Sequence, residues 1–201
     1  MRLYFAPMAC SLAARIALNE AGIDADYTQV RLAERRTAEG EDYLAINPKA
    51  QVPALGLPDG RVVTEGPAVL QLIADAAPEA GLVPAAGTAA RVEVQAWLNF
   101  LATEIHKGLF YPLFHPMAPE GARDFARETA MPKLAHLATR EWLVERFSIA
   151  DAYLLAILNW FEAGKLDIRD WPVLAAWRER VRQRPSVVAA LRAELPLYQA
   201  A

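Results

Sequence analysis

The chain has 201 residues, of which 54% are hydrophobic and 22% charged, and its formal net charge is −3. A chain of this length can bury a substantial core, as one large domain or two small ones. The mild acidity argues against nucleic acid as the main partner, because binding phosphates needs clustered Lys and Arg. The small cluster of Arg31, Arg35 and Arg36 is suited at most to a small anion.

Membrane and secreted classes are also disfavoured. The sequence has no run approaching the roughly 18 consecutive apolar residues that span a bilayer, so we expect no membrane partner. Pro7 interrupts the apolar N-terminal stretch, and we expect no signal peptide. The single cysteine, Cys10, excludes an intramolecular disulfide, which leaves the cytoplasm as the expected compartment.

The first part of the chain predicts alternating strands and helices. A strand, a helix and a second strand in succession imply a parallel pair with a crossover. Pro58-Asp59-Gly60 is a turn signal that predicts a hairpin between two further strands. The predicted strands cover residues 2–5, 27–32, 52–57 and 61–63, and the predicted helices cover 11–21 and 65–76.

The rest of the chain predicts helices only. Residues 77–87 are rich in Pro and Gly and indicate a linker. Ser148-Ile-Ala-Asp151 is a capping box, and the apolar helix that it opens is typical of a central buried helix. We therefore expect an α/β domain over residues 1–78 and an all-α domain over 87–201. The other predicted helices cover 88–107, 119–138, 172–184 and 186–195.

Cys10 lies at the predicted turn between the first strand and the first helix. The unpaired amides and the dipole of a helix N-terminus favour a thiolate there. The competing interpretation is a small buried apolar residue, which is the usual role of a lone cysteine. Because the sequence lacks a second cysteine, any disulfide must form with an outside thiol.

Two further segments have features of a peptide-binding site. A cis bond before Pro53 would expose the backbone of Val52 to a peptide-like ligand, although a trans proline at the start of a strand is the commoner case. The Gly66 amide is suited to a carboxylate and Glu65 to an ammonium group, which together describe an α-amino acid head. Ordinary helix capping explains the same residues.

The predicted helix over 88–107 has two faces at 100° per residue. Its apolar stripe carries Val94, Leu98, Leu101 and Ile105. The opposite stripe is polar, which is typical of a solvated face but also of a helix that borders a cleft. On that stripe His106 is a candidate proton carrier, and Lys107 is a candidate for lowering the pKa of a nearby thiol. The polar stripe consists of Asn99, Thr103, His106 and Lys107.

Taken together, these segments resemble bacterial beta-class glutathione S-transferases over nearly the whole chain. The resemblance implies a thioredoxin-like first domain, an all-helical second domain and a cytoplasmic, detoxifying homodimer. Glutathione would be the co-substrate, a small hydrophobic electrophile would be the second substrate, and no metal would take part. The matching runs are PMACSLA at 7–13, DYLAINPKAQVPAL at 42–55, TEGPAVLQLIAD at 64–75, WLNFLATEIHKG at 97–108 and ERFSIADAYL at 145–154.

The resemblance also implies roles for individual residues. Cys10 would face the glutathione sulfur, and His106 would activate or hydrogen-bond that thiol. Val52, before a cis Pro53, would hold the cysteinyl part by its backbone. The remaining binding positions would be Arg35 for the glycyl end, Glu65 and Gly66 for the γ-glutamyl end, and Asn99, Thr103, Glu104 and Lys107 from the second domain.

Two departures and two alternatives accompany this resemblance. Met8 stands where a small residue, commonly Gly, is expected, and its size should narrow the electrophile site. The segment 138–147 looks shorter than in relatives, which should tighten a loop far from Cys10.

A glutathione-dependent reductase, isomerase or ether-cleaving enzyme on the same fold is an alternative, because a fold does not fix chemistry. A non-catalytic binding protein is a second alternative.

Overall fold

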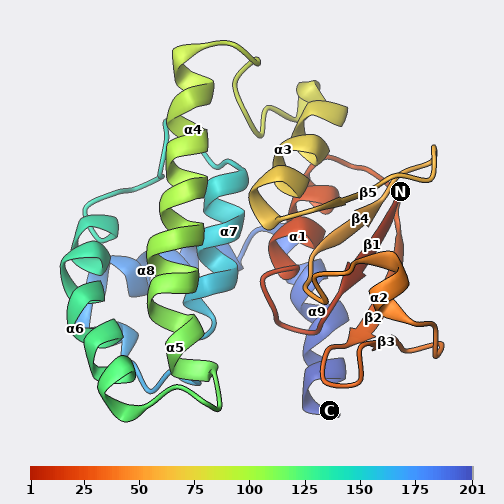
Figure 1. The fold of residues 1–201 in the computed structure, drawn as a ribbon. Coiled ribbons are helices and arrows are strands. Elements are labelled where there is room, and N and C mark those ends of the chain that lie inside the picture. The colour runs from red at the N-terminus through yellow and green to blue at the C-terminus, as the bar shows by residue number, and fades with distance from the viewer. Residues whose placement is uncertain (201) are drawn as a thin grey trace.

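The computed structural model describes residues 1–200, and within them five short strands form one mixed sheet. The strand order is β3-β2-β1-β4-β5 (Figure 1), with β1 and β2 parallel and the remaining neighbours antiparallel. The predicted parallel pair and the predicted hairpin are both confirmed. The strands are β1 (Arg2–Phe5), β2 (Asp26–Arg31), β3 (Arg36–Thr37), β4 (Ala54–Gly56) and β5 (Val62–Thr64).

Side chains on β1 alternate between two cores. Leu3 and Phe5 join the large core with α1 (Leu12–Glu20) and α3 (Gly66–Ala76). Tyr4 points to the other face, into a small cluster with Tyr43 of α2 (Tyr43–Ile46). This period of two is the pleat of a strand buried on both faces. The sheet therefore has helices on both sides, with α1 and α3 between it and the second domain (Figure 1).

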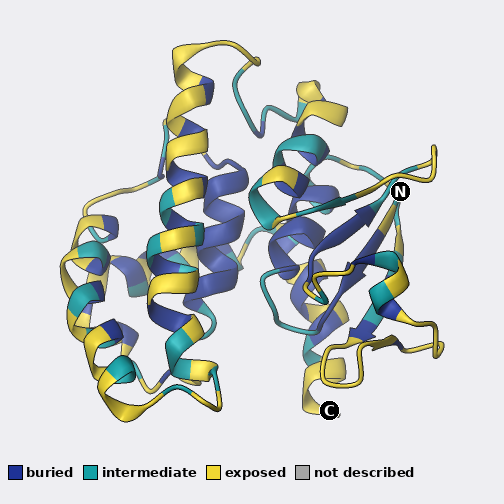
Figure 2. Ribbon diagram, viewed as in Figure 1, coloured by how far each residue is buried: buried dark blue, intermediate teal, exposed yellow. Residues whose placement is uncertain are grey.

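The second domain is helical, as predicted, and α7 (Ile149–Leu158) lies at its centre. Every residue of α7 is buried (Figure 2). Its predicted capping box is confirmed: the Asp151 carboxylate accepts from the Ser148 N–H at 2.9 Å. The other elements are η1 (Pro78–Ala80), α4 (Ala89–Phe100), η2 (Leu101–Phe110), α5 (Tyr111–Phe114), α6 (Glu120–Leu137), η3 (Ile168–Asp170), α8 (Pro172–Arg182) and α9 (Pro185–Gln199).

The long helix differs from prediction in two respects: it runs past residue 107 to Phe114, and its middle part is not α-helical. After Phe100 it continues as η2, which is π-helical rather than α-helical. A side chain at Gly108 would place its Cβ 3.1 Å from the Thr103 carbonyl oxygen, five residues earlier, so the tight turn there favours glycine. The apolar stripe is still buried, as predicted, and π-helical turns are frequent at functional sites.

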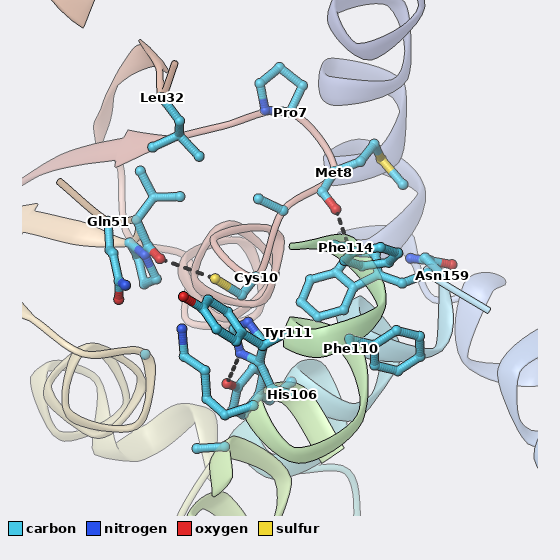
Figure 3. Close-up of a pocket in the computed structure, with 18 of the residues that line it drawn as sticks. Pro7, Met8, Cys10, Leu32, Gln51, His106, Phe110, Tyr111, Phe114 and Asn159 are labelled. Atoms are coloured by element: carbon cyan, nitrogen blue, oxygen red, sulfur yellow. Dashed lines mark hydrogen bonds between the residues drawn. The ribbon is translucent and has the colours of Figure 1, made fainter. Parts of the chain in front are cut away.

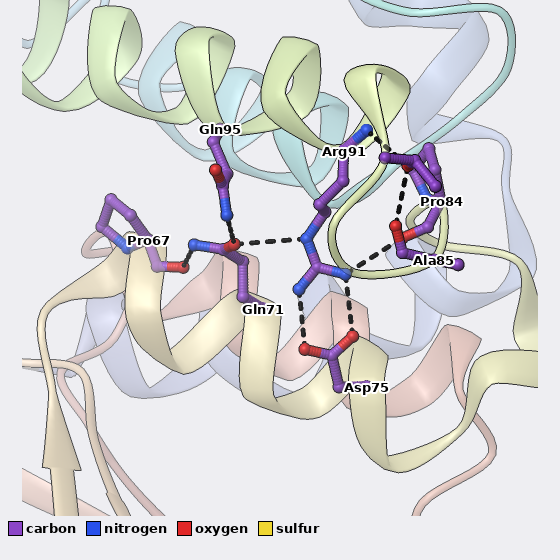
Figure 4. A network of polar contacts seen from close by, with 8 residues as sticks. Pro67, Gln71, Asp75, Pro84, Ala85, Arg91 and Gln95 are labelled. Carbon is purple, nitrogen blue, oxygen red and sulfur yellow. Dashed lines mark hydrogen bonds and ion pairs between the residues drawn. The ribbon is translucent and has the colours of Figure 1, made fainter.

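Polar contacts join the two domains beside the linker. Arg91 of α4 is buried, and its guanidinium pairs with the Asp75 carboxylate of α3 at 2.6 and 2.8 Å (Figure 4). It also donates to the Pro84 carbonyl and to Gln71, whose own amide donates to the Pro67 carbonyl. The network thus runs from the linker to the first turn of α3.

The end of the chain returns to the first domain. Helix α9 packs against α1 although the two lie at opposite ends of the sequence (Figure 1). In residues 1–200 we find no helix that is both long enough and apolar enough for a membrane span.

Candidate functional site

A large open cleft lies between the sheet edge of the first domain and the helical domain. Its volume is about 1810 Å³. Pockets for a single small ligand usually measure about 300–1,000 Å³, so this cleft has room for two substrates. One wall carries the loop before α1, the segment that precedes β4 and the start of α3. The other wall carries η2, α5 and the segment after α7 (Figure 3).

Cys10 lies in this cleft with its thiol turned to the sheet edge. Its sulfur donates to the Val52 carbonyl oxygen at 3.1 Å (Figure 3). Burial raises the pKa of the Cys10 thiol to about 11, although the Lys107 charge and nearby amides act in the opposite direction. The expectation that the helix start would stabilise a thiolate here is therefore wrong. Desolvation of the sulfur outweighs the few amides that face it.

The neighbouring edge of the first domain presents backbone groups and one carboxylate. The Val52–Pro53 peptide bond is cis, as the resemblance implied. Glu65 has a φ of 72°, a conformation that a non-glycine residue rarely adopts and that often marks a ligand site. The Lys49 ammonium contacts the Glu65 carboxylate at 2.6 Å. Glu65 is thus already placed to accept a cation, as an amino acid head would require.

His106 projects from η2 and is held by the second domain. Its Nδ1 lies 2.7 Å from the Tyr153 hydroxyl of α7. Burial, with a smaller effect from Lys107, lowers the pKa of His106 to about 4, so the ring is neutral near pH 7. Burial also raises the pKa of Tyr153, which keeps its proton. His106 and Tyr153 therefore offer neutral hydrogen-bonding groups in the cleft, and His106 adds no positive charge to that of Lys107.

Aromatic side chains form the rest of the helical wall. Trp160 packs edge-on against His106, with ring centroids 4.9 Å apart, and also against Phe110 at 5.5 Å. Phe114 stacks on Phe110 at 5.6 Å. The Lys107 ammonium lies 5.0 Å from the centroid of the Tyr111 ring. This wall is suited to an apolar, flat ligand whose reacting atom is near His106.

The structure brings most of the predicted site residues together. The cleft is lined by Cys10, Arg35, Val52, Pro53, Glu65, Gly66, Thr103, His106 and Lys107. Within residues 1–200 its lining leaves out Asn99 and Glu104. Asn99 is exposed, and the Glu104 carboxylate is paired with Lys133 at 2.6 Å.

Tyr153, Trp160 and Glu194 were missed by sequence reasoning. Tyr153 stands in the apolar helix that predicts only a core position. Trp160 follows that helix, and Glu194 is a carboxylate on a late helix, where a solvated face is the usual interpretation. Only the fold places these three residues beside the loop that carries Cys10.

Comparisons with known proteins agree with this geometry. A family model described as "Glutathione S-transferase, N-terminal domain" matches residues 7–76, and one described as "Glutathione S-transferase, C-terminal domain" matches 101–185. Glutathione S-transferase GstA of Escherichia coli O157:H7 is 43% identical, with 96% of this chain and 98% of that protein covered.

Solved structures show the same similarity. A sphingomonad glutathione S-transferase complexed with glutathione matches with a TM-score of 0.92 and 43% identity. A bacterial beta-class glutathione S-transferase from Sphingomonas chungbukensis matches with a TM-score of 0.92 and 42% identity. Each comparison covers 96% of this chain and 98% of the other chain.

Proposed function

The chain belongs to the glutathione S-transferase family, with its bacterial beta-class members among its relatives, and we propose how its cleft performs the transfer. Glutathione binds along the first domain, and its own sulfur attacks a hydrophobic electrophile held by the aromatic wall. The observation that carries this proposal is the neutral Cys10 thiol, hydrogen-bonded to Val52 within the cleft. A thiol with so high a pKa is a poor nucleophile near neutral pH.

The first-domain contacts suit a γ-glutamyl peptide. The Glu65 carboxylate, now paired with Lys49, would bind the α-ammonium group, and the Gly66 amide would bind the α-carboxylate. The Val52 backbone would hold the cysteinyl part, and Arg35 would attract the glycyl carboxylate. A carbonyl oxygen has two lone pairs, so Val52 can accept from a peptide N–H as well as from Cys10.

The helical wall supplies the groups that stabilise a sulfur anion. The Tyr153 hydroxyl keeps its proton and lies 2.7 Å from Nδ1 of His106. We assign the hydroxyl as the donor in this contact, which places the hydrogen of the neutral ring on Nε2. That N–H and the Lys107 charge favour the glutathione thiolate. The thiol proton leaves to water, the sulfur forms a bond to the electrophilic carbon, and the leaving group departs with its electron pair. Holding both substrates in one cleft supplies much of the rate gain.

Oligomeric state and compartment are part of the same proposal. A homodimer is supported by large apolar side chains exposed on the second domain, among them Val92 of α4 and Phe125 of α6. Light scattering of the purified protein measures this directly, and a monomeric mass at all concentrations would contradict it. The cytoplasm is supported by the free thiol of the single cysteine.

The decisive experiment combines glutathione-agarose retention with two assays. Wild type and Cys10→Ala are compared in conjugation of glutathione to chlorodinitrobenzene and in reduction of a glutathione mixed disulfide. We expect retention, and conjugation by Cys10→Ala within about threefold of wild type, because glutathione supplies the nucleophile. A reductase signal alone, lost in Cys10→Ala, would indicate disulfide exchange instead. Failure of retention and of both activities would leave a binding protein on this fold.

The hydrogen bond between His106 and Tyr153 gives a further test. Tyr153→Phe removes the hydroxyl, and we expect the conjugation rate to fall about tenfold, the factor for one hydrogen bond in a buried site. Tyr111→Phe is the matched control, since it changes the same atoms on a half-exposed ring of the same cleft. Equal rates for the two variants would contradict the role given to Tyr153.

A further inference from the structure

Met8, two residues before Cys10, has both of its backbone polar groups bound by side chains of the helical domain. Its N–H donates to the Glu194 carboxylate of α9 at 2.8 Å. Its carbonyl oxygen accepts from the Trp160 indole N–H, also at 2.8 Å (Figure 3). Side chains 186 and 152 positions away in the sequence thus hold the two peptide groups on either side of Met8.

We propose that Trp160 and Glu194 are positioning residues that hold Met8 in a left-handed backbone conformation, and thereby fix the loop of Cys10 and the width of the electrophile site. The inference rests on the proposed function for its effect on catalysis. Its effect on the loop itself is independent of glutathione. We call the three residues Met8, Trp160 and Glu194 the Met8 clamp.

The backbone of Met8 needs such support. Its φ is 58°, in the region that favours glycine. A side chain there brings Cβ close to the following carbonyl oxygen, which disfavours the conformation for any residue other than glycine. Such residues persist where surrounding contacts determine the conformation. Two hydrogen bonds to one residue, on its N–H and its C=O, are contacts of that kind.

Glu194 is a rigid anchor for its half of the clamp. Its side chain is completely buried, and its second oxygen accepts from the Arg15 guanidinium at 2.8 Å. That guanidinium lies over two aromatic rings of the sheet, 4.5 Å from the Phe5 centroid and 3.8 Å from that of Tyr27. One carboxylate oxygen of Glu194 is therefore fixed by Arg15 of α1, and the other accepts from the Met8 N–H.

Trp160 connects the loop to the reaction site. While its N–H holds Met8, its ring packs against His106 and Phe110 on the cleft wall. The Met8 side chain lines the same cleft. One tryptophan thus sets the spacing between the first-domain loop and the wall that receives the electrophile. We infer that the clamp governs which electrophiles fit, more than how glutathione binds.

Cys10 gives the loop a built-in reporter, because it is the only cysteine in the chain. Its alkylation by iodoacetamide, measured from pH 7 to 10, reports how accessible and how acidic the thiol is. Trp160→Phe removes the indole N–H but keeps an aromatic ring. We expect alkylation about fivefold faster than in wild type, the factor for one lost hydrogen bond. Trp177→Phe, a buried tryptophan of α8 outside the cleft, is the matched control and should stay within about twofold.

The second readout separates the two substrates. In conjugation assays Trp160→Phe should raise KM for the electrophile about fivefold and change KM for glutathione less than about twofold. Met8→Gly supplies the rescue, since glycine adopts a positive φ without support. In the Met8→Gly background, the effect of Trp160→Phe on alkylation should shrink to within about twofold.

Three outcomes overturn the proposal. The first is an alkylation rate of Cys10 in Trp160→Phe that equals the rate in Trp177→Phe. The second is a rise in KM for glutathione without a rise in KM for the electrophile, and the third is an effect of Trp160→Phe on alkylation that is as large in the Met8→Gly background as in wild type. Should Trp160→Phe fail to fold, Glu194→Gln, which keeps the side-chain shape, is measured in the same way and judged by the same alkylation and rescue criteria. A wild type without conjugation would refute the proposed function, and alkylation would then decide the clamp by itself.

Discussion

Two of the ion pairs that join the domains have the same chemistry in opposite surroundings. In the pair between Arg91 and Asp75, the arginine is buried but the carboxylate side chain is 48% exposed. In the pair between Arg15 and Glu194, the side chains are 8% and 0% exposed. Hydrogen bonding to Arg91 lowers the pKa of Asp75, whereas burial raises the pKa of Glu194 despite its partner.

This comparison shows that the same pair of groups has different energetic roles. At the linker, water still solvates Asp75, and the contact favours the charged carboxylate. Beside the Cys10 loop, removing both charges from water costs free energy that their attraction only partly returns. The buried pair is better explained by the position it enforces on Met8 than by a gain in stability.

The largest expected effect comes from replacing the buried arginine. Arg15→Met leaves the Glu194 carboxylate without a cation in the protein interior. We expect the free energy of unfolding to fall by about 3–5 kcal/mol, as measured by urea denaturation. Adding Glu194→Leu removes the orphaned charge, and the double variant should recover most of the loss. A loss below about 1 kcal/mol for Arg15→Met would contradict the claim that breaking the buried pair costs more stability than breaking the half-exposed pair.

The matched change at the linker should cost less. Arg91→Met leaves Asp75 half-exposed, so water can solvate the carboxylate that has lost its partner. We expect a decrease of about 1–2 kcal/mol in the free energy of unfolding, mainly from lost hydrogen bonds of the buried guanidinium. An effect as large as that of Arg15→Met would show that exposure does not distinguish the pairs.

The pH dependence of stability should differ in sign. The pKa of Asp75 is lowered, so its contribution is present above the ordinary carboxylate pKa and is lost as the pH falls through the folded value. The pKa of Glu194 is raised, so the folded state takes up its proton first, and its contribution decreases as the pH rises through the folded value.

Unfolding of Asp75→Asn and Glu194→Gln at pH 4 to 7 tests these signs. Relative to wild type, Asp75→Asn should lose less stability on acidification, and Glu194→Gln should lose less as the pH rises. Screening of the half-exposed Asp75 should keep its effect below about 1 kcal/mol. Changes of the same sign in both variants would contradict the assignment.

The smallest expected effect is that of the pair between Arg91 and Asp75 on the reactivity of Cys10 in the active-site loop. The contacts of Arg91 end on Gln71, Asp75 and Pro84, away from the residues that hold Met8. Arg91→Met should therefore change the iodoacetamide alkylation rate of Cys10 by less than about twofold. Gln95→Met, at the edge of the same network, serves as the control. A change of about fivefold would mean that both pairs position the loop.

The sequence by itself determined the order of the elements, because that order depends on local signals. Apolar periodicity placed the long helices, Pro58-Asp59-Gly60 placed the hairpin, and Ser148 and Asp151 placed the start of α7. The β3 strand and the α2 helix were missed because they span only two and four residues, too few for a period to appear.

The matched motifs likewise indicated site residues, and most of these line the cleft. They did not indicate the protonation states there. The local position of Cys10 at a helix start favours a thiolate, and the polar stripe of the long helix favours an ionisable His106. Burial by segments distant in sequence reverses both expectations, since desolvation depends on the whole surroundings of a group.

Only the tertiary structure decided which residues from the C-terminal part of the chain belong to the site. Glu194 reaches Met8 because α9 returns to pack against α1, and Trp160 reaches it because the segment after α7 forms part of the cleft wall. A hydrogen bond across 186 residues leaves no periodic or spacing signal in the sequence. Its geometry exists only once the two domains are packed together.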